Sequence, residues 1–277
     1  MASAAAVLER LDAPLAPVLR NDARDTSPIA PFSDAQLARD AITALIDEAE
    51  LTPKPALVDR RGSGAHRDLD LAIMRRSAHA LEPTFAALAR TARRRGEPSA
   101  LLRAELAQIG RAGEQDMLQA TGGSNAHRGA IWIIGLLVAG VALETSSSAS
   151  MRTHGAGAPS PLDTSRVCTL AAQIACFPDR FAASSDSHGE RARRRYQVGG
   201  ARREAQDGFP HALDVGLPAL RAARARGLDE NTARIDDLPR VDIPGSWVDV
   251  VVQADRPFAV EPLFTRDPRH IGDLQVL

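Results

Sequence analysis

The sequence predicts an all-α fold, with a single multi-helix domain followed by a C-terminal tail of different character. Apolar residues recur at helical spacing in several segments, and no strand pattern of weight occurs before residue 240. Aromatic residues make up only 4% of the 277 residues, whereas alanine and leucine are abundant, which favours closely packed helices over a sheet. With 44% hydrophobic residues, a chain of this length can bury a substantial core.

The first half of the chain shows a leader and then four predicted helices. Residues 1–32 are rich in alanine, proline, arginine and aspartate without a stable period, so we expect a loose leader there. Ser33 and Asp34 are typical N-cap residues, and an apolar stripe at helical spacing follows them to Ala49. Further helices are expected at about 68–79, 83–95 and 99–118, the last two opened by proline or serine.

The second half contains the most apolar run of the chain, from Ala130 to Leu143. At ~1.5 Å per residue this run spans about 21 Å, short of the ~30 Å core of a bilayer, so we expect a buried helix and no membrane span. A flexible loop is expected at 146–161, and helices at 163–176, up to 226 and at 229–238. The predicted domains are therefore a helical catalytic domain at 33–238 and a divergent tail at 239–277, where prolines recur and 248–252 is β-like.

Charge and cysteine content narrow the classes of function. A net charge of −1 argues against a general binder of nucleic acids or of anionic membranes. Cys168 and Cys176 lie about 12 Å apart along one expected helix, which is too far for a disulfide. We therefore expect two reduced core thiols. Because no signal peptide is visible at Met1 to Leu8, we also expect a cytoplasmic protein.

A stiff polar connection, from Glu48 to Asp70, lies between two of the predicted helices. Pro53 and Pro55 each fix φ near ~−65° and push the preceding residue toward extended geometry. Between them stands Lys54, the only lysine in the chain. Two interpretations remain open: an ammonium group is required at this position, or the segment is a rigid interhelical loop with solvated charges.

A second polar segment, at 121–129, is a glycine-rich loop that runs into the start of the buried helix. Free N–H groups and the positive end of the helix dipole make it a candidate anion site, although an interhelical turn has the same pattern. No strand precedes it and no Gly-Lys-Ser/Thr sequence ends it, so it is not a P-loop. Gly110 and Gly113, inside the helix before it, cost about 1 kcal/mol each relative to alanine. They indicate either close helix packing or access for a ligand.

Metal binding and proton transfer are further hypotheses for these segments. His66 with Asp68, or Asp59 with Asp68, could bind a divalent metal, and Mg²⁺ would prefer the carboxylates. His66 and His127 could transfer protons because the charge of histidine changes near neutral pH. A histidine in a polar loop is also often only a hydrogen-bonding residue.

Several motifs, in order, resemble those of the triphosphoribosyl-dephospho-CoA synthase family. They are Glu-Leu-Thr-Pro-Lys-Pro-Ala-Leu-Val-Asp (50–59), Gly-Ala-His-Arg-Asp (64–68), Gly-Glu-Gln-Asp-Met-Leu (113–118), Thr-Gly-Gly-Ser-Asn-Ala-His-Arg-Gly-Ala-Ile (121–131), and Gly-Ala-Arg-Arg-Glu-Ala with Gly-Phe-Pro (200–210). The resemblance covers about residues 34–236 and looks most like the malonate decarboxylase branch, with the citrate lyase branch as the near relative.

The resemblance implies an all-helical enzyme that joins ATP to 3′-dephospho-CoA and releases adenine. The product would be the precursor of the prosthetic group on the acyl-carrier subunit of malonate decarboxylase. Such a glycosyl transfer passes through an oxocarbenium-like state, which requires a base for the attacking hydroxyl, a donor for the leaving adenine and cations for the triphosphate.

The resemblance also assigns roles to residues of the matching motifs. Lys54, Arg128 and Arg202 suit the triphosphate, together with Mg²⁺ on Asp59 and Asp68. The full substrate-binding set expected from the motifs is Lys54, Arg60, Thr121, Asn125, Arg128, Gly129 and Arg202. The expected catalytic groups are Glu114 or Glu204 as the base and His66 or His127 as the donor.

Two departures from the family pattern keep a second hypothesis open. Ala126 stands where the family usually has threonine, and after Asn231-Thr232-Ala233 no Asp-Thr…His-Arg-Gly-like motif follows. A shifted reading frame or a truncation would explain the second departure. The alternative function is therefore a catalytically impaired relative that only binds nucleotide or dephospho-CoA. A helical metal-dependent nucleotide hydrolase is a third hypothesis.

Overall fold

The fold is a bundle of helices, as the sequence predicts. The computed structural model describes residues 32–54, 56–152, 162–181 and 200–235, with two short strands at 249–250 and 262–263. In chain order the helices are α2 (Asp34–Glu50), α3 (Leu71–Ala80), α4 (Glu82–Arg95), α5 (Ala100–Thr121), α6 (Arg128–Arg152), α7 (Thr164–Cys176), α9 (Gly200–Gln206), the π-helix η1 (His211–Gly216), α10 (Leu217–Ala225) and α11 (Glu230–Ile235). The strands β1 (Asp249–Val250) and β2 (Pro262–Leu263) pair antiparallel. The expected leader lies outside the described residues, apart from Phe32.

Side-chain caps fix where most of these helices begin. Ser33 accepts a hydrogen bond from the Gln36 N–H at 3.2 Å at the start of α2, as predicted, and Ser99 does the same for α5. The second predicted helix, expected from about residue 68, begins later, because the Asp70 carboxylate accepts from the Ile73 N–H at 2.7 Å and leaves Asp68 in the preceding loop. The expected loop from residue 146 is wrong in its first part, since α6 continues to Arg152.

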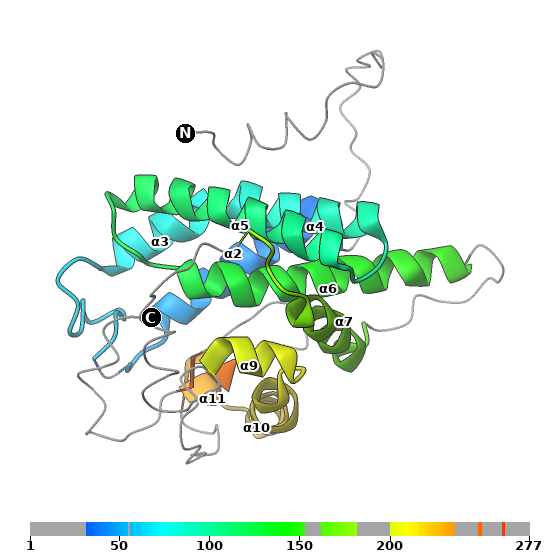
Figure 1. The fold of residues 1–277 in the computed structure, drawn as a ribbon. Coiled ribbons are helices and arrows are strands. Elements are labelled where there is room, and N and C mark those ends of the chain that lie inside the picture. Colours follow the sequence, from blue (N-terminus) through cyan, green and yellow to red (C-terminus); the bar gives the residue numbers. More distant parts are fainter. Residues whose placement is uncertain are drawn as a thin grey trace, which may run out of the picture.

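Helix α6 is the central element of the bundle. It runs across the middle of the molecule between α4 and α5 on one side and α7 and α9 on the other (Figure 1). Every residue from Ile133 to Leu143 is buried, so the prediction of a buried helix is confirmed. By length and composition alone the range Arg128–Ser147 could cross a membrane, but 67% of it lies inside the folded protein.

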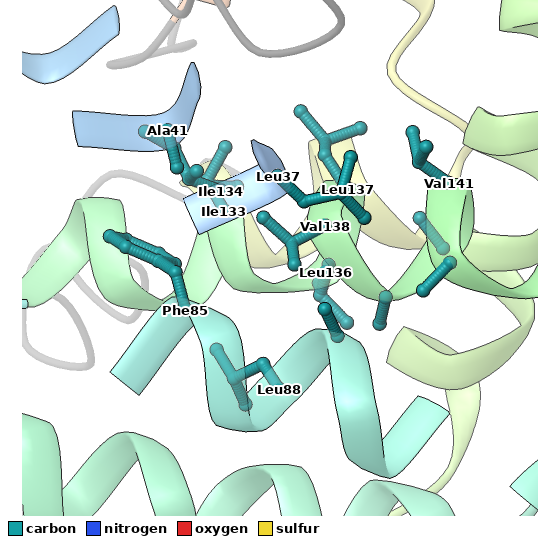
Figure 2. Packing of buried hydrophobic residues seen from close by; sticks show 14 of the residues in the cluster. Leu37, Ala41, Phe85, Leu88, Ile133, Ile134, Leu136, Leu137, Val138 and Val141 are labelled. Atoms are coloured by element: carbon teal, nitrogen blue, oxygen red, sulfur yellow. The ribbon is translucent and has the colours of Figure 1, made fainter. Parts of the chain in front are cut away.

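The main core forms where α2, α4 and α6 meet (Figure 2). Phe85 and Leu88 of α4 point toward α6, which presents a row of branched aliphatic side chains that includes Ile134 and Leu137. Each such side chain stabilises the fold by about 1.5–3 kcal/mol when it leaves water. A second, smaller cluster of apolar residues holds α10 and α11 together, around Leu220.

Both cysteines are free thiols, but only one belongs to the core. Cys168 is buried, and burial together with the charge of Glu204 raises the pKa of its thiol to about 12. Cys176 is the last residue of α7 and is exposed, so the prediction of a second core thiol is wrong.

The two glycines inside α5 serve different purposes. A Cβ added at Gly113 would lie 2.4 Å from Thr84 Oγ1 of α4, so this glycine permits the close approach of the two helices. A Cβ at Gly110 would meet only Ile131 Cγ2, at an ordinary 3.4 Å, and Gly110 lines an open cleft. Gly113 is therefore explained by close helix packing. For Gly110, access for a ligand remains a prediction.

Because only Gly113 is in close contact with a neighbouring helix, replacing glycine by alanine should change stability in opposite directions at Gly113 and Gly110. Gly113→Ala should lower the free energy of unfolding by about 1–3 kcal/mol, because an overpacked core must shift. Gly110→Ala, the matched control in the same helix, should be neutral or stabilise by up to ~1 kcal/mol through helix propensity. Urea unfolding of both variants measures this, and equal destabilisation by the two would refute the packing role of Gly113.

Candidate functional site

The connection between α2 and α3 turns its lysine inward. Lys54 is only 3% exposed, and its Nζ donates to the backbone oxygen of Glu48 at 2.7 Å and to the Glu48 carboxylate at 2.8 Å. This ammonium is therefore not a solvated surface charge. It stays in the interior because the end of α2 supplies one carboxylate and one carbonyl oxygen.

Asp59 holds the connection in this shape. Its carboxylate accepts hydrogen bonds from the Lys54 N–H at 2.9 Å, the Arg61 N–H at 2.7 Å and the Arg61 Nε at 2.8 Å. Burial alone would raise the pKa of Asp59, but these bonds to the charged form outweigh burial and lower the pKa to about 2. Asp59 is thus ionised over the physiological pH range and fixes the backbone at Lys54.

The far end of the described chain also anchors this connection. The Asn231 side chain of α11 accepts from the Thr52 N–H at 2.9 Å and donates to the Thr52 carbonyl at 2.5 Å. Arg234, on the same helix, lies 3.6 Å from the Asp47 carboxylate of α2. The backbone before Lys54 is therefore tied to a helix far away in sequence.

His127 immediately precedes α6, and its buried ring is close enough to Lys54 for the charge of the ammonium to act on it. Its Nδ1 is 2.7 Å from Ser77 Oγ of α3, whereas its Nε2 is buried and has no hydrogen-bond partner among the described residues. Burial, and in second place the positive charge of Lys54, lower the pKa of His127 to about 4. The imidazole is therefore neutral at pH 7, and Nε2 is its one free polar atom.

The next residue, Arg128, faces the outside of the bundle. Its guanidinium pairs with the Glu114 carboxylate of α5, and both side chains line a cleft of about 220 Å³ between α5 and α6. The start of α6 thus separates two adjoining sites, the interior around His127 and the cleft around Arg128. Of these two successive residues, His127 places its side chain in the interior and Arg128 places its side chain in the cleft.

The glycine-rich loop is both a shaped turn and the cap of α6. Gly122 and Gly123 adopt positive φ values of 69° and 102°, which glycine tolerates without strain. Thr121 Oγ1 donates to the Ser124 carbonyl at 2.6 Å, and the Asn125 side chain accepts from the Arg128 N–H at 3.2 Å. Thr121 and Asn125 therefore order this loop, and Gly129 follows them with no atom near its missing Cβ.

The first two predicted segments are in contact with each other. Ser124 Oγ of the glycine-rich loop donates to the Asp68 carbonyl at 3.0 Å. His66 lies partly exposed nearby in sequence, and the Asp68 side chain is exposed. Arg60 is exposed and pairs with Glu50 at 3.1 Å, a carboxylate that Arg75 also binds.

The residues of the motif at 200–210 divide between two locations. Glu204 is 6% exposed and accepts from the His211 N–H at 3.0 Å and from His211 Nδ1 at 2.5 Å, so it holds the start of η1. Arg202 is exposed, and its charge acts on the Arg103 guanidinium in the cleft wall. Neither residue lines the cleft, although the charge of Arg202 reaches Arg103 in its wall.

The described residues offer little support for a metal site built by the protein. No group of three or more His, Cys, Asp or Glu side chains in the described ranges is arranged to hold a metal ion. Both oxygens of Asp59 already accept hydrogen bonds, and Asp68 is exposed. A Mg²⁺ ion on these two carboxylates would have to displace the Arg61 guanidinium; that site stays a prediction.

Sequence reasoning missed residues that shape both sites, among them Glu48, Ser77, Arg103 and Trp132. Ser77 and Arg103 are polar side chains on buried helix faces, at 0% and 9% exposure, and this position within an apolar stripe is the signal that could have revealed them. Nothing in the sequence marks Glu48 as the partner of Lys54, because its position depends on how the connection folds back.

Comparison with known proteins identifies the protein family. A family model described as ATP:dephospho-CoA triphosphoribosyl transferase matches residues 34–239. The chain belongs to this triphosphoribosyl transferase family. A second model, the alpha subunit (transporter) of malonate decarboxylase, matches residues 229–277. The change in character of the tail therefore coincides with a match to a different family.

Curated relatives of this chain are named for the synthesis of triphosphoribosyl-dephospho-CoA. A probable 2-(5″-triphosphoribosyl)-3′-dephosphocoenzyme-A synthase of Azotobacter vinelandii is 53% identical over 199 residues, which cover 72% of this chain and 63% of the relative. The synthase of Klebsiella pneumoniae is 50% identical over 202 residues, or 73% of this chain and 67% of that one. The chain thus spans less than two thirds of the Azotobacter relative. No solved structure matches this chain.

The buried imidazole predicts a pH-dependent stability. The ordinary histidine pKa of 6.5 applies to the unfolded chain, whereas that of folded His127 is about 4. Between pH 6.5 and 4 the unfolded chain therefore binds a proton that the folded protein rejects, and stability is lost as pH falls, by up to ~3 kcal/mol. Urea unfolding at several pH values should show this loss in the wild type and a smaller one in His127→Asn.

The exposed His79 of α3 supplies the control for this measurement. His79→Asn should keep the full pH dependence of the wild type. If His127→Asn kept it as well, His127 would not be the buried neutral histidine described above.

Proposed function

We propose that this chain is a transferase that joins ATP to 3′-dephospho-CoA, giving 2′-(5″-triphosphoribosyl)-3′-dephospho-CoA and adenine. Membership of the family, over 34–239, supports this reaction. The observation that carries it is the arrangement at the start of α6, where the interior with Lys54 and His127 adjoins a cleft with Arg128 and Glu114. Cations, a carboxylate and an unpaired imidazole nitrogen are the groups that this chemistry needs.

The proposed step is a displacement at the ribose of ATP. The 2′-hydroxyl oxygen of dephospho-CoA bonds to C1′ as the C1′–N9 bond breaks, and the triphosphate stays on the transferred ribose. A base takes the hydroxyl proton, and adenine leaves after accepting a proton or a hydrogen bond. Lys54, Arg128 and Arg202 would compensate the charge of the triphosphate, with Arg60, Thr121, Asn125 and Gly129 lining the approach.

The environments of the acidic residues and histidines favour particular assignments. Glu114 is the better candidate for the base, because it faces the cleft, whereas both oxygens of Glu204 bind His211. His127 is the better donor than His66, since its free Nε2 lies in a buried region where a hydrogen bond is strong. As a neutral group it would act as a hydrogen-bond donor and not as a resident imidazolium.

We propose that Mg²⁺ accompanies the triphosphate, whose oxygens are preferred ligands. Asp59 and Asp68 would then supply additional contacts to the ion, and the triphosphate its main ligands. The cellular setting follows from the chemistry: ATP and dephospho-CoA are cytoplasmic metabolites, and neither a nucleic acid nor a membrane is required. The tail match supports a link to malonate decarboxylase, whose acyl-carrier subunit would receive the product.

A binding-only relative is the second candidate, favoured by one observation. From about residue 229 the chain matches the decarboxylase alpha subunit, and it covers 63% of the Azotobacter relative. Mass spectrometry of a reaction with ATP and dephospho-CoA separates the candidates. Stoichiometric adenine and the triphosphoribosyl product support the transferase. Binding of both nucleotides without adenine supports the binding-only protein, and ATP loss without dephospho-CoA indicates a hydrolase.

The buried lysine gives the sharpest test by mutation. Lys54→Ala should reduce ATP-dependent product formation more than ~10-fold, because one positioned catalytic or charge-compensating group contributes 10²–10⁴ in rate. Arg39→Gln on α2 is a suitable control, since Arg39 contacts only Gln36 among the described hydrogen bonds. Near-normal turnover of a folded Lys54→Ala protein would remove Lys54 from the site.

A further inference from the structure

The wall of the α5–α6 cleft contains a buried arginine with too few partners. Arg103 is 9% exposed, and its Nε is buried without a hydrogen-bond partner among the described residues. Its closest carboxylate contact there is Asp179, at a loose 3.9 Å from Nη2. An incompletely paired buried guanidinium is costly, and an anionic ligand would relieve that cost.

The charges around Arg103 favour an anion in this cleft. Arg111 pairs with the same Asp179 carboxylate at 2.8 Å, and the charge of Arg202 also acts on Arg103. Burial, Arg111 and Arg202 lower the pKa of Arg103, while only Asp179 raises it. Two guanidinium groups thus share the Asp179 carboxylate, and the charge of a third acts on Arg103. Arginine is the side chain that binds phosphate oxygens through two parallel N–H groups.

The part of the cleft beside Arg103 suits a flat ring. The Arg103 guanidinium lies over the Trp132 ring, 4.5 Å from its centre, and the indole Nε1 is buried without a partner. Ile131 and Leu136 form an apolar floor, and Gly110 leaves space beside it. A volume of about 220 Å³ is below the ~300–1,000 Å³ of sites that hold a whole ligand, so the cleft fits one part of a larger molecule.

We propose that this cleft binds the adenosine-phosphate part of one of the two substrates, with the purine ring against Trp132 and the phosphates on Arg103, Arg111 and Arg202. The proposal rests on the proposed function only for the choice of ligand, since ATP and dephospho-CoA share this chemistry. It adds Arg103, Arg111 and Trp132 to the residues of the site.

Tryptophan fluorescence tests the proposal without requiring turnover. The chain has two tryptophans, Trp132 and Trp247, so in a Trp247→Phe background Trp132 is the only reporter. Titration with ATP, with dephospho-CoA and with inorganic tripolyphosphate should quench Trp132 with at least one of the two nucleotides. If only one nucleotide quenches Trp132, that substrate supplies the purine ring. If both nucleotides quench it, the cleft accepts either substrate. Equal quenching by tripolyphosphate, or none with any ligand, would overturn the proposal.

Arginine variants in the same background provide the second measurement. Arg103→Gln should weaken nucleotide binding about 10-fold or more, and Arg111→Gln, at the exposed rim, about 3-fold or more, so the test survives if Arg103→Gln fails to fold. Arg166→Gln, an exposed arginine of α7 that pairs with Glu144, is the control and should bind as before. Unchanged affinity in both cleft variants would refute the site.

This result is distinguishable from a failure of the proposed function. Quenching of Trp132 without adenine release would leave the cleft as a nucleotide site in a protein that is not an active transferase. Adenine release without quenching, and with unchanged product formation by Arg103→Gln and Arg111→Gln, would uphold the transferase and refute the cleft.

Discussion

The burial of α6 is the constraint on which the rest of the structure depends. Its apolar side chains pack against α2, α4 and α7, and this packing fixes where the helix begins and how it is rotated. His127, the residue immediately before the helix, is buried, whereas Arg128, its first residue, is exposed. The two sites are therefore consequences of one packed helix, and a change in the core at Ile134 or Leu137 would move both.

Long-range polar contacts complete what the core begins. The connection after α2 has few apolar residues, and its shape comes from Asp59, from the bond between Ser124 and Asp68, and from the Asn231 clamp on Thr52. These contacts bring the only ammonium of the chain beside a histidine that burial keeps neutral. The clamp is at the point where the two family matches overlap, residues 229–239, so the part of the chain that carries Asn231 still serves the transferase fold.

Sequence patterns predicted the helices well because caps and apolar spacing are local signals. Ser33, Ser99 and Asp163 mark helix starts that the structure has, and the apolar run of α6 is buried. The predicted start of α3 and end of α6 were wrong, since Asp70 caps α3 after the expected start and the helix of α6 continues through the serines to Arg152. The site was less accessible to prediction. Whether Glu114 or Glu204 faces a cleft depends on partners such as Arg128 and His211, which no local pattern reveals.

The central claim is that Lys54 and His127 share one buried region at the start of α6. The most direct measurement is the pKa of His127 by NMR of histidine-labelled protein, in the wild type and in Lys54→Gln. The account predicts a pKa well below 6.5 in the wild type, near 4, and a higher value in Lys54→Gln because a neighbouring positive charge is removed. A His127 that titrates near 6.5 in both proteins would contradict the account.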